Sequence, residues 1–205
     1  MKEKIKFAFH ISFHPFDGFY DMKHEKRGSL AAALCIFAAA LACHILAQQT
    51  SAFLFNPQKF APYDMFFEIT KYLLIFVIFC ISNWSVTTLM QGEGTFKDIV
   101  MTAGYACLPF VLIPLPVAII SNISTYTESV YLDAANYLAL IWFALLLFFG
   151  IMTVHQYSLG KMVGTAVVTA VAMAAIIFLC LLFYNLFSQL VGFVYSLYKE
   201  IALRT

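Results

Sequence analysis

Two histidines near the start of this 205-residue chain have a spacing that could hold a metal ion. His10 and His14 are four residues apart, which places two imidazoles on one side of a helix. However, Pro15 disfavours helical geometry at His14, and no acidic or cysteine ligand stands close enough in sequence to complete a site. We therefore expect neither a metal ion nor any other cofactor here.

Two further patterns resemble catalytic motifs. Ser158-Leu-Gly-Lys161 has the Ser-x-x-Lys spacing of some hydrolases, but the companion motifs are absent. Gly92-Glu-Gly94 resembles a phosphate loop, yet no strand pattern precedes it and no Gly-Lys-Ser/Thr follows. We expect these glycines to form a tight reversal before a helix capped by Thr95. The sequence therefore predicts a protein that is not an enzyme.

The composition indicates a protein embedded in lipid. Hydrophobic residues make up 62% of the chain and charged residues only 11%, whereas soluble domains carry about 25% charged residues. Backbone in lipid must pair its own polar groups, so the apolar runs should be helices. The predicted fold is an all-α integral membrane protein, a five-transmembrane-helix bundle with an N-terminal interfacial amphipathic helix. The spans, each long enough for a hydrocarbon core of about 30 Å, are 29–47, 67–90, 99–120, 134–154 and 163–187.

The predicted spans carry no Asp, Glu, Lys or Arg near their centres. Such charges are costly and persist for function, so their absence disfavours an ion-coupled carrier or an intramembrane enzyme. One polar cluster remains, Ser82–Thr88, with Asn83, Trp84, Thr87 and Thr88 at the inner half of the second span. Its side chains can join neighbouring helices or line a solute site, and we favour the first use.

The distribution of basic residues predicts the orientation. Basic residues concentrate on the cytoplasmic side of a membrane, so the N-terminus should be cytoplasmic and the C-terminus outside. Net charge is only +1, which gives no basic field to attract nucleic acid. The eight bases on the inside are Lys2, Lys4, Lys6, Lys23, Lys26, Arg27, Lys97 and Lys161, and the three on the outside are Lys59, Lys199 and Arg204.

Residues 1–28 form a separate cytoplasmic segment, residues 29–187 the membrane domain, and residues 188–205 a short outward-facing tail. Within the first segment, Pro15 suits the first turn of a helix and Gly28 its end. Phe16, Phe19, Tyr20 and Lys23 recur at three- and four-residue spacing, which predicts one aromatic face with a snorkelling base. Such a helix would lie in the membrane interface and lead into the first span.

Small residues predict where helices pack closely. They recur every four residues in the first and fifth spans, and such rows let helix backbones approach each other. We expect these faces to be seams between helices, either within the bundle or with other membrane proteins or a second copy of the chain. The third span holds several prolines and should bend or break. The residues concerned are Ala31, Cys35, Ala39 and Cys43, then Gly164, Ala166, Ala170 and Ala174, and finally Pro109, Pro114 and Pro116.

Several motifs along the chain resemble one family. They are His14-Pro15-Phe16, Asn83-Trp84, the loop Gly92-Glu-Gly94-Thr95-Phe96, and Gly104-Tyr105 followed by Pro109. In this order they resemble the bacterial branch of the Yip family, the Ypt/Rab-interacting membrane proteins, over residues 10–187. Ala106 stands where the family's Gly-Tyr-Ser element has serine.

The resemblance implies five spans, a cytoplasmic N-terminus and a non-enzymatic role in the cell membrane. We expect a multi-pass plasma-membrane protein that organises or assists other membrane proteins; the alternative is a small-solute transporter or transporter subunit. Eukaryotic members engage prenylated Rab GTPases, but this chain lacks their acidic arm and Asp-Leu-x-Gly-Pro element, so the resemblance does not extend to a Rab partner. The predicted cytoplasmic contact face comprises His14, Pro15, Phe16, Asp17, Phe19, Gly92, Gly94, Thr95, Phe96 and Lys97.

Overall fold

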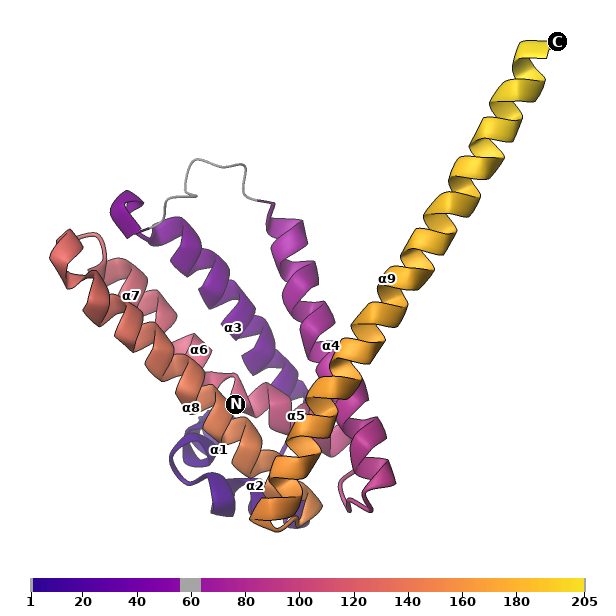
Figure 1. The fold of residues 1–205 in the computed structure, drawn as a ribbon. Coiled ribbons are helices and arrows are strands. Elements are labelled where there is room, and N and C mark those ends of the chain that lie inside the picture. The colour runs from indigo at the N-terminus through magenta and orange to yellow at the C-terminus, as the bar shows by residue number, and fades with distance from the viewer. Residues whose placement is uncertain (1, 56–63, 205) are drawn as a thin grey trace.

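A computed structural model describes residues 2–55 and 64–204, and this part of the chain forms a bundle of helices (Figure 1). Five of its helical segments are long and apolar enough to cross a membrane. The predicted all-α, five-span fold is therefore confirmed. The five segments are Leu30–Thr50, Met65–Leu89, Phe96–Ile120, Tyr126–His155 and Leu159–Glu200.

Successive spans run in opposite directions, and the two N-terminal helices lie at the end of the bundle where the first span begins (Figure 1). Two short 3-10 turns, η1 (Phe53–Phe55) and η2 (Tyr126–Glu128), follow the first span and precede the fourth. The α-helices of the described residues are α1 (Lys2–Phe13), α2 (Pro15–His24), α3 (Leu30–Thr50), α4 (Met65–Leu89), α5 (Phe96–Ala106), α6 (Leu108–Leu112), α7 (Pro114–Ile120), α8 (Ser129–His155) and α9 (Leu159–Arg204).

The third span is broken twice, as its prolines predict. Helix α5 ends before Cys107, and α6 begins with Pro109 in its first turn. A second break at Ile113 separates α6 from α7, which begins at Pro114. Proline removes a backbone donor and crowds the preceding turn, so a continuous helix cannot form here.

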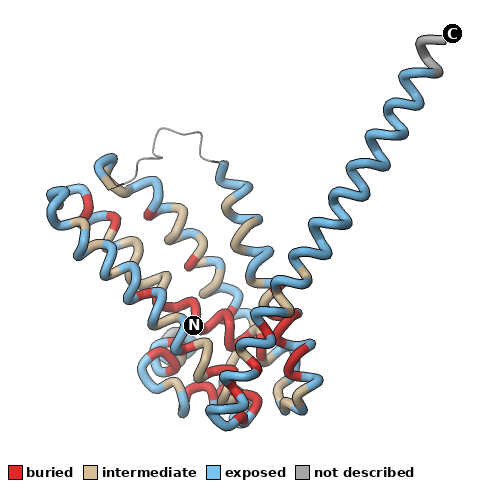
Figure 2. The backbone as a smooth tube through the Cα atoms, in the orientation of Figure 1, coloured by how far each residue is buried: buried red, intermediate tan, exposed pale blue. Residues whose placement is uncertain are grey.

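Helices α3 and α5 pack closely against each other. A Cβ atom added to Gly104 would lie 2.7 Å from the carbonyl oxygen of Ala33, so only glycine allows this approach. The next residue, Tyr105, is 2% exposed, and its hydroxyl accepts a hydrogen bond from the backbone N–H of Ser29 at 3.2 Å. Buried residues concentrate at this end of the bundle, near α1 and α2 (Figure 2).

The N-terminal segment differs from the prediction in two ways. It forms two helices instead of one, and α2 ends at His24 because Lys26 adopts the left-handed conformation at φ 53°. The predicted aromatic face is also divided. Phe19 is fully buried, whereas Phe16 and Tyr20 are about half exposed at 49% and 51%. Helix α2 packs against α8, so it is docked on the bundle.

The fifth span does not end at Phe187. Helix α9 continues without a break to Arg204, through the segment that was predicted to be a separate tail. Residues 188–204 contain no proline and a single glycine, Gly192, so nothing in the sequence stops the helix. Lys59, one of the outside bases in the charge comparison, lies outside the described residues.

We predict that Gly104→Ala destabilises the protein by about 1–3 kcal/mol, because the added methyl group must push α3 and α5 apart. Thermal unfolding of the purified protein in detergent measures this. Gly164→Ala is the matched control, since it makes the same change in a helix with no atom within 4 Å of the new Cβ. Equal effects of the two substitutions would contradict the role assigned to Gly104.

Candidate functional site

The residues of the predicted contact face lie on α2 and its N-cap His14, and on the loop between α4 and α5 with the first turn of α5, at the same end of the bundle (Figure 1). Only some of them are available to a partner. Phe19 belongs to the core, Gly92 and Gly94 pack against the ring of His155, and Pro15 is half-buried. The exposed members are His14, Phe16, Asp17, Thr95, Phe96 and Lys97.

Lys23 connects α2 with both α8 and the loop before α5. Its Nζ donates a hydrogen bond to the carbonyl oxygen of Val154 at 2.8 Å and forms an ion pair with Glu93 at 3.2 Å. Val154 lies in the last turn of α8, where carbonyl groups lack helical partners and where the helix dipole favours a positive charge. Lys23 therefore completes the end of α8 and holds the loop beside it.

His155 lies beneath the glycine loop and is 2% exposed. Its Nδ1 accepts a hydrogen bond from the backbone N–H of Gly94 at 3.2 Å, so in the neutral ring the proton is on Nε2. A Cβ atom on Gly94 would lie 2.7 Å from Cε1 of the ring, and one on Gly92 would collide with Nδ1. The reversal itself is made by Gln91 at φ 55°, and neither glycine has a positive φ. Glycine is therefore required at both positions because a larger side chain would collide with His155. It is not required by the backbone conformation of the turn, although the sequence suggested this.

Tyr157, in the turn between α8 and α9, contacts both His155 and the end of α4. Its hydroxyl donates to the carbonyl oxygens of Thr87 at 3.3 Å and Met90 at 3.4 Å, at the end of α4. Burial raises the pKa of Tyr157, which keeps this hydroxyl a donor. Its ring stacks on His155 with 5.3 Å between centroids. We call Lys23, Glu93, Gly94, His155 and Tyr157 the loop junction.

Sequence reasoning identified Lys23 as a snorkelling base on the aromatic face of the N-terminal helix and Gly94 as a loop residue, but it missed Glu93, His155 and Tyr157. Their roles depend on two chain turns, 90–95 and 156–158, meeting in space. The only sequence signal was the placement of polar aromatic residues directly after a long apolar run.

The polar cluster of α4 divides between two faces. Asn83 and Thr87 are buried, whereas Trp84 and Thr88 are exposed. The Asn83 side-chain amide donates to Thr169 of α9 at 3.4 Å, and the Thr87 and Thr88 hydroxyls donate to backbone carbonyls of α4 itself. Asn83 thus connects α4 with α9 by a hydrogen bond, and the Trp84 ring connects α4 with α5 through an edge-on contact with Phe96, 5.8 Å between centroids. Within the described residues, Asn83 Oδ1 and the Ser82 hydroxyl are buried without a hydrogen-bond partner.

The element Gly104, Tyr105 and Pro109 lies at the junction of α1, α3 and the broken span. Phe7 of α1 packs edge-on against Tyr105 with 6.0 Å between ring centroids. Pro109 is buried in the first turn of α6. This element therefore supports helix packing and is covered by the N-terminal helix.

We predict that Lys23→Met loosens the loop before α5, because it removes both the ion pair and the bond to Val154. Hydrogen–deuterium exchange of residues 91–98 should accelerate on the order of fivefold, the equivalent of about 1 kcal/mol. Lys97→Met is the control, since Lys97 is an exposed base in the same segment. Unchanged exchange in the Lys23 variant would show that the junction does not hold the loop.

Comparison with known proteins gives one match. A family model described as the Yip1 domain matches residues 9–183, which cover the end of α1, all of α2, four complete spans and the first half of α9. No curated protein and no solved structure matches the chain. The family match covers well over half of the sequence and agrees with the five apolar helical segments. The chain is therefore a multi-pass membrane protein that belongs to the Yip1-domain family.

Proposed function

We propose that this chain is a non-catalytic protein of the plasma membrane that organises or assists other membrane proteins. The proposal places its N-terminus in the cytoplasm and its C-terminus outside, in accord with the excess of bases near the N-terminus. The observation that supports it best is the length of α9, together with the apolar surface that this helix carries away from the bundle.

Helix α9 is far longer than a membrane crossing requires. Its 46 residues extend about 69 Å at 1.5 Å per residue, whereas the hydrocarbon core is about 30 Å thick. Even a helix tilted by about 40° would cross that core within about 26 residues. With Lys161 at the inner boundary, α9 leaves the hydrocarbon at or before about Phe187. Figure 1 shows that its second half has no neighbouring helix, and residues 182–200 are exposed throughout (Figure 2).

The part of α9 beyond Phe187 is amphipathic. Leu190, Val194 and Leu197 recur at three- and four-residue spacing and are 59%, 55% and 49% exposed. Ser188 and Ser196 lie on the opposite side of the helix, by the same periodicity. Outside the hydrocarbon an apolar stripe of this kind is unfavourable unless another surface covers it. We propose that a helix of a partner membrane protein, or of a second copy, covers this stripe.

The other contact surface in this proposal is at the cytoplasmic end. Phe16, Phe96 and Lys97 are exposed there, and the loop junction holds the segments that carry them together. The small-residue rows also face outward in part. Gly164 has open space beside it, and Ala170 is exposed. These surfaces favour assembly with other proteins as the role of the chain.

The test is co-purification of the full-length protein in mild detergent. We expect a stoichiometric partner or a dimer, and we expect Leu190→Arg with Leu197→Arg to abolish the complex because two charges would enter the apolar stripe. Ser188→Arg with Ser196→Arg adds the same charge to the polar side and should leave the complex intact. A single copy without any partner would contradict the proposal, as would equal behaviour of both double variants.

A small-solute carrier is the second candidate. The twice-broken third span and the buried, unpartnered oxygens of Ser82 and Asn83 favour it, because carriers build sites from broken helices at mid-membrane. Solute flux in proteoliposomes that Asn83→Leu abolishes would establish this function. Absence of flux beside a stoichiometric partner would exclude it.

A further inference from the structure

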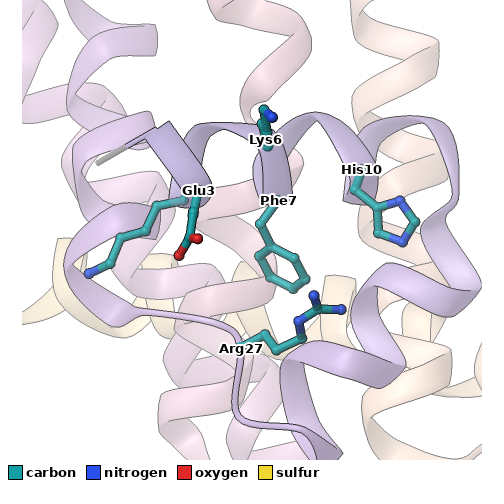
Figure 3. Close-up of a pocket in the computed structure, with 6 residues that line it drawn as sticks. Glu3, Lys6, Phe7, His10 and Arg27 are labelled. Atoms are coloured by element: carbon teal, nitrogen blue, oxygen red, sulfur yellow. The ribbon is translucent and has the colours of Figure 1, made fainter.

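A groove beside α1 has the size and charge to hold a small anionic group (Figure 3). Its volume is about 630 Å³. The Glu3 carboxylate, the rings of Phe7 and His10, and the Arg27 guanidinium surround the same space in Figure 3. The six lining residues come from α1 and from the linker between α2 and α3: Glu3, Lys4, Lys6, Phe7, His10 and Arg27.

In the described part of the chain, two of the three bases that line this groove are free of ion pairs. The lining holds Lys4, Lys6 and Arg27 beside the Glu3 carboxylate. Within the described residues, neither Lys4 nor Lys6 forms an ion pair; Lys4 instead donates to the hydroxyl of Ser29 at 3.2 Å. The groove therefore retains basic groups that are not neutralised by the protein.

The Arg27 guanidinium has N–H groups that its ion pairs do not use. It lies over the Phe7 ring, 6.0 Å from the centroid, and pairs with Asp21 at 3.0 Å and with Glu25 at 3.6 Å. Both ion pairs use Nη1, so Nε and Nη2 stay available. A guanidinium presents its donors in a planar fork that fits two oxygens of one phosphate. The groove thus combines a phosphate-binding fork with two lysines.

The position of the groove relative to the membrane favours a lipid over a dissolved anion as its ligand. Lys4 is bonded to Ser29, the N-cap of α3, which is the first helix to cross the membrane. The backbone N–H of Ser29 is in turn bonded to the buried Tyr105 hydroxyl. The groove therefore opens where a span begins, which is the level of phospholipid headgroups.

We infer that this groove binds the phosphate of an anionic phospholipid whose headgroup carries hydroxyl groups. Arg27 and Lys4 hold the phosphate, Lys6 adds charge at the edge, and the Glu3 carboxylate accepts a hydrogen bond from a headgroup hydroxyl. Lys4 and Lys6, which form no ion pair within the described residues, favour a lipid with net negative charge over a zwitterionic one. This inference does not depend on the proposed function.

The test uses full-length protein in detergent, titrated with phosphatidylglycerol, phosphatidylcholine or glycerol phosphate, with bound lipid counted by native mass spectrometry. We expect phosphatidylglycerol to bind more tightly than phosphatidylcholine. We expect the double variant Lys4→Gln with Arg27→Gln to bind phosphatidylglycerol about five- to tenfold more weakly than the unaltered protein. Lys6→Gln, which breaks no contact of the fold, should weaken this binding less. Lys26→Gln removes an adjacent base outside the groove and should match the unaltered protein.

Three results would overturn the inference. Equal binding of the two lipids would remove the selectivity for negative charge. An equal loss in Lys26→Gln would mean that diffuse surface charge, not the groove, attracts the lipid. Full competition by glycerol phosphate at the lipid's own concentration would assign the groove to a soluble anion.

Discussion

Unpaired backbone groups at helix ends are the constraint on which this bundle depends. The last carbonyls of a helix have no partners within it, and lipid offers none. Here two of these ends receive side chains from distant parts of the chain: Tyr157 donates to the end of α4, and Lys23 donates to the end of α8. Because Lys23 belongs to α2, pairing the carbonyl of Val154 also docks the N-terminal segment. The satisfaction of backbone groups thus determines where α2 lies.

The attachment of α9 is of a different kind. Its N-terminal half packs against α4, where Asn83 donates to Thr169 and Met90 accepts from Thr165. Side-chain hydrogen bonds between membrane helices contribute only about 0.6 kcal/mol on average. The rest of α9 has no neighbour within the described chain (Figure 1). The first half of α9 is therefore held by extensive packing on α4, whereas its second half contacts no other helix of the described chain and leaves its surface open to a partner helix.

Features that depend on local sequence were predictable. The five spans follow from composition, the breaks in the third span from its prolines, and the start of α5 from Thr95 and Asp98, which form a capping box. Features that depend on distant contacts were not. The purpose of Gly94 is visible only beside His155, and that ring lies 61 residues away in sequence. Likewise, α1 lacked a clear apolar run, and its helix gains from Phe7 packing on Tyr105.

Helix α2 connects the groove beside α1 with the loop junction. Arg27, which lines the groove, pairs with Asp21 on α2, and Lys23, two residues further on and on a different side of the same helix, pairs with Glu93 of the loop. A headgroup that engages the free donors of Arg27 therefore acts on the segment that also holds the exposed loop before α5. Helix α2 is short, and Phe19 in its middle is buried in the core, so Asp21 and Lys23 belong to one short helix held on the bundle. The proposed lipid site and the proposed cytoplasmic contact surface would then be linked through one helix of ten residues.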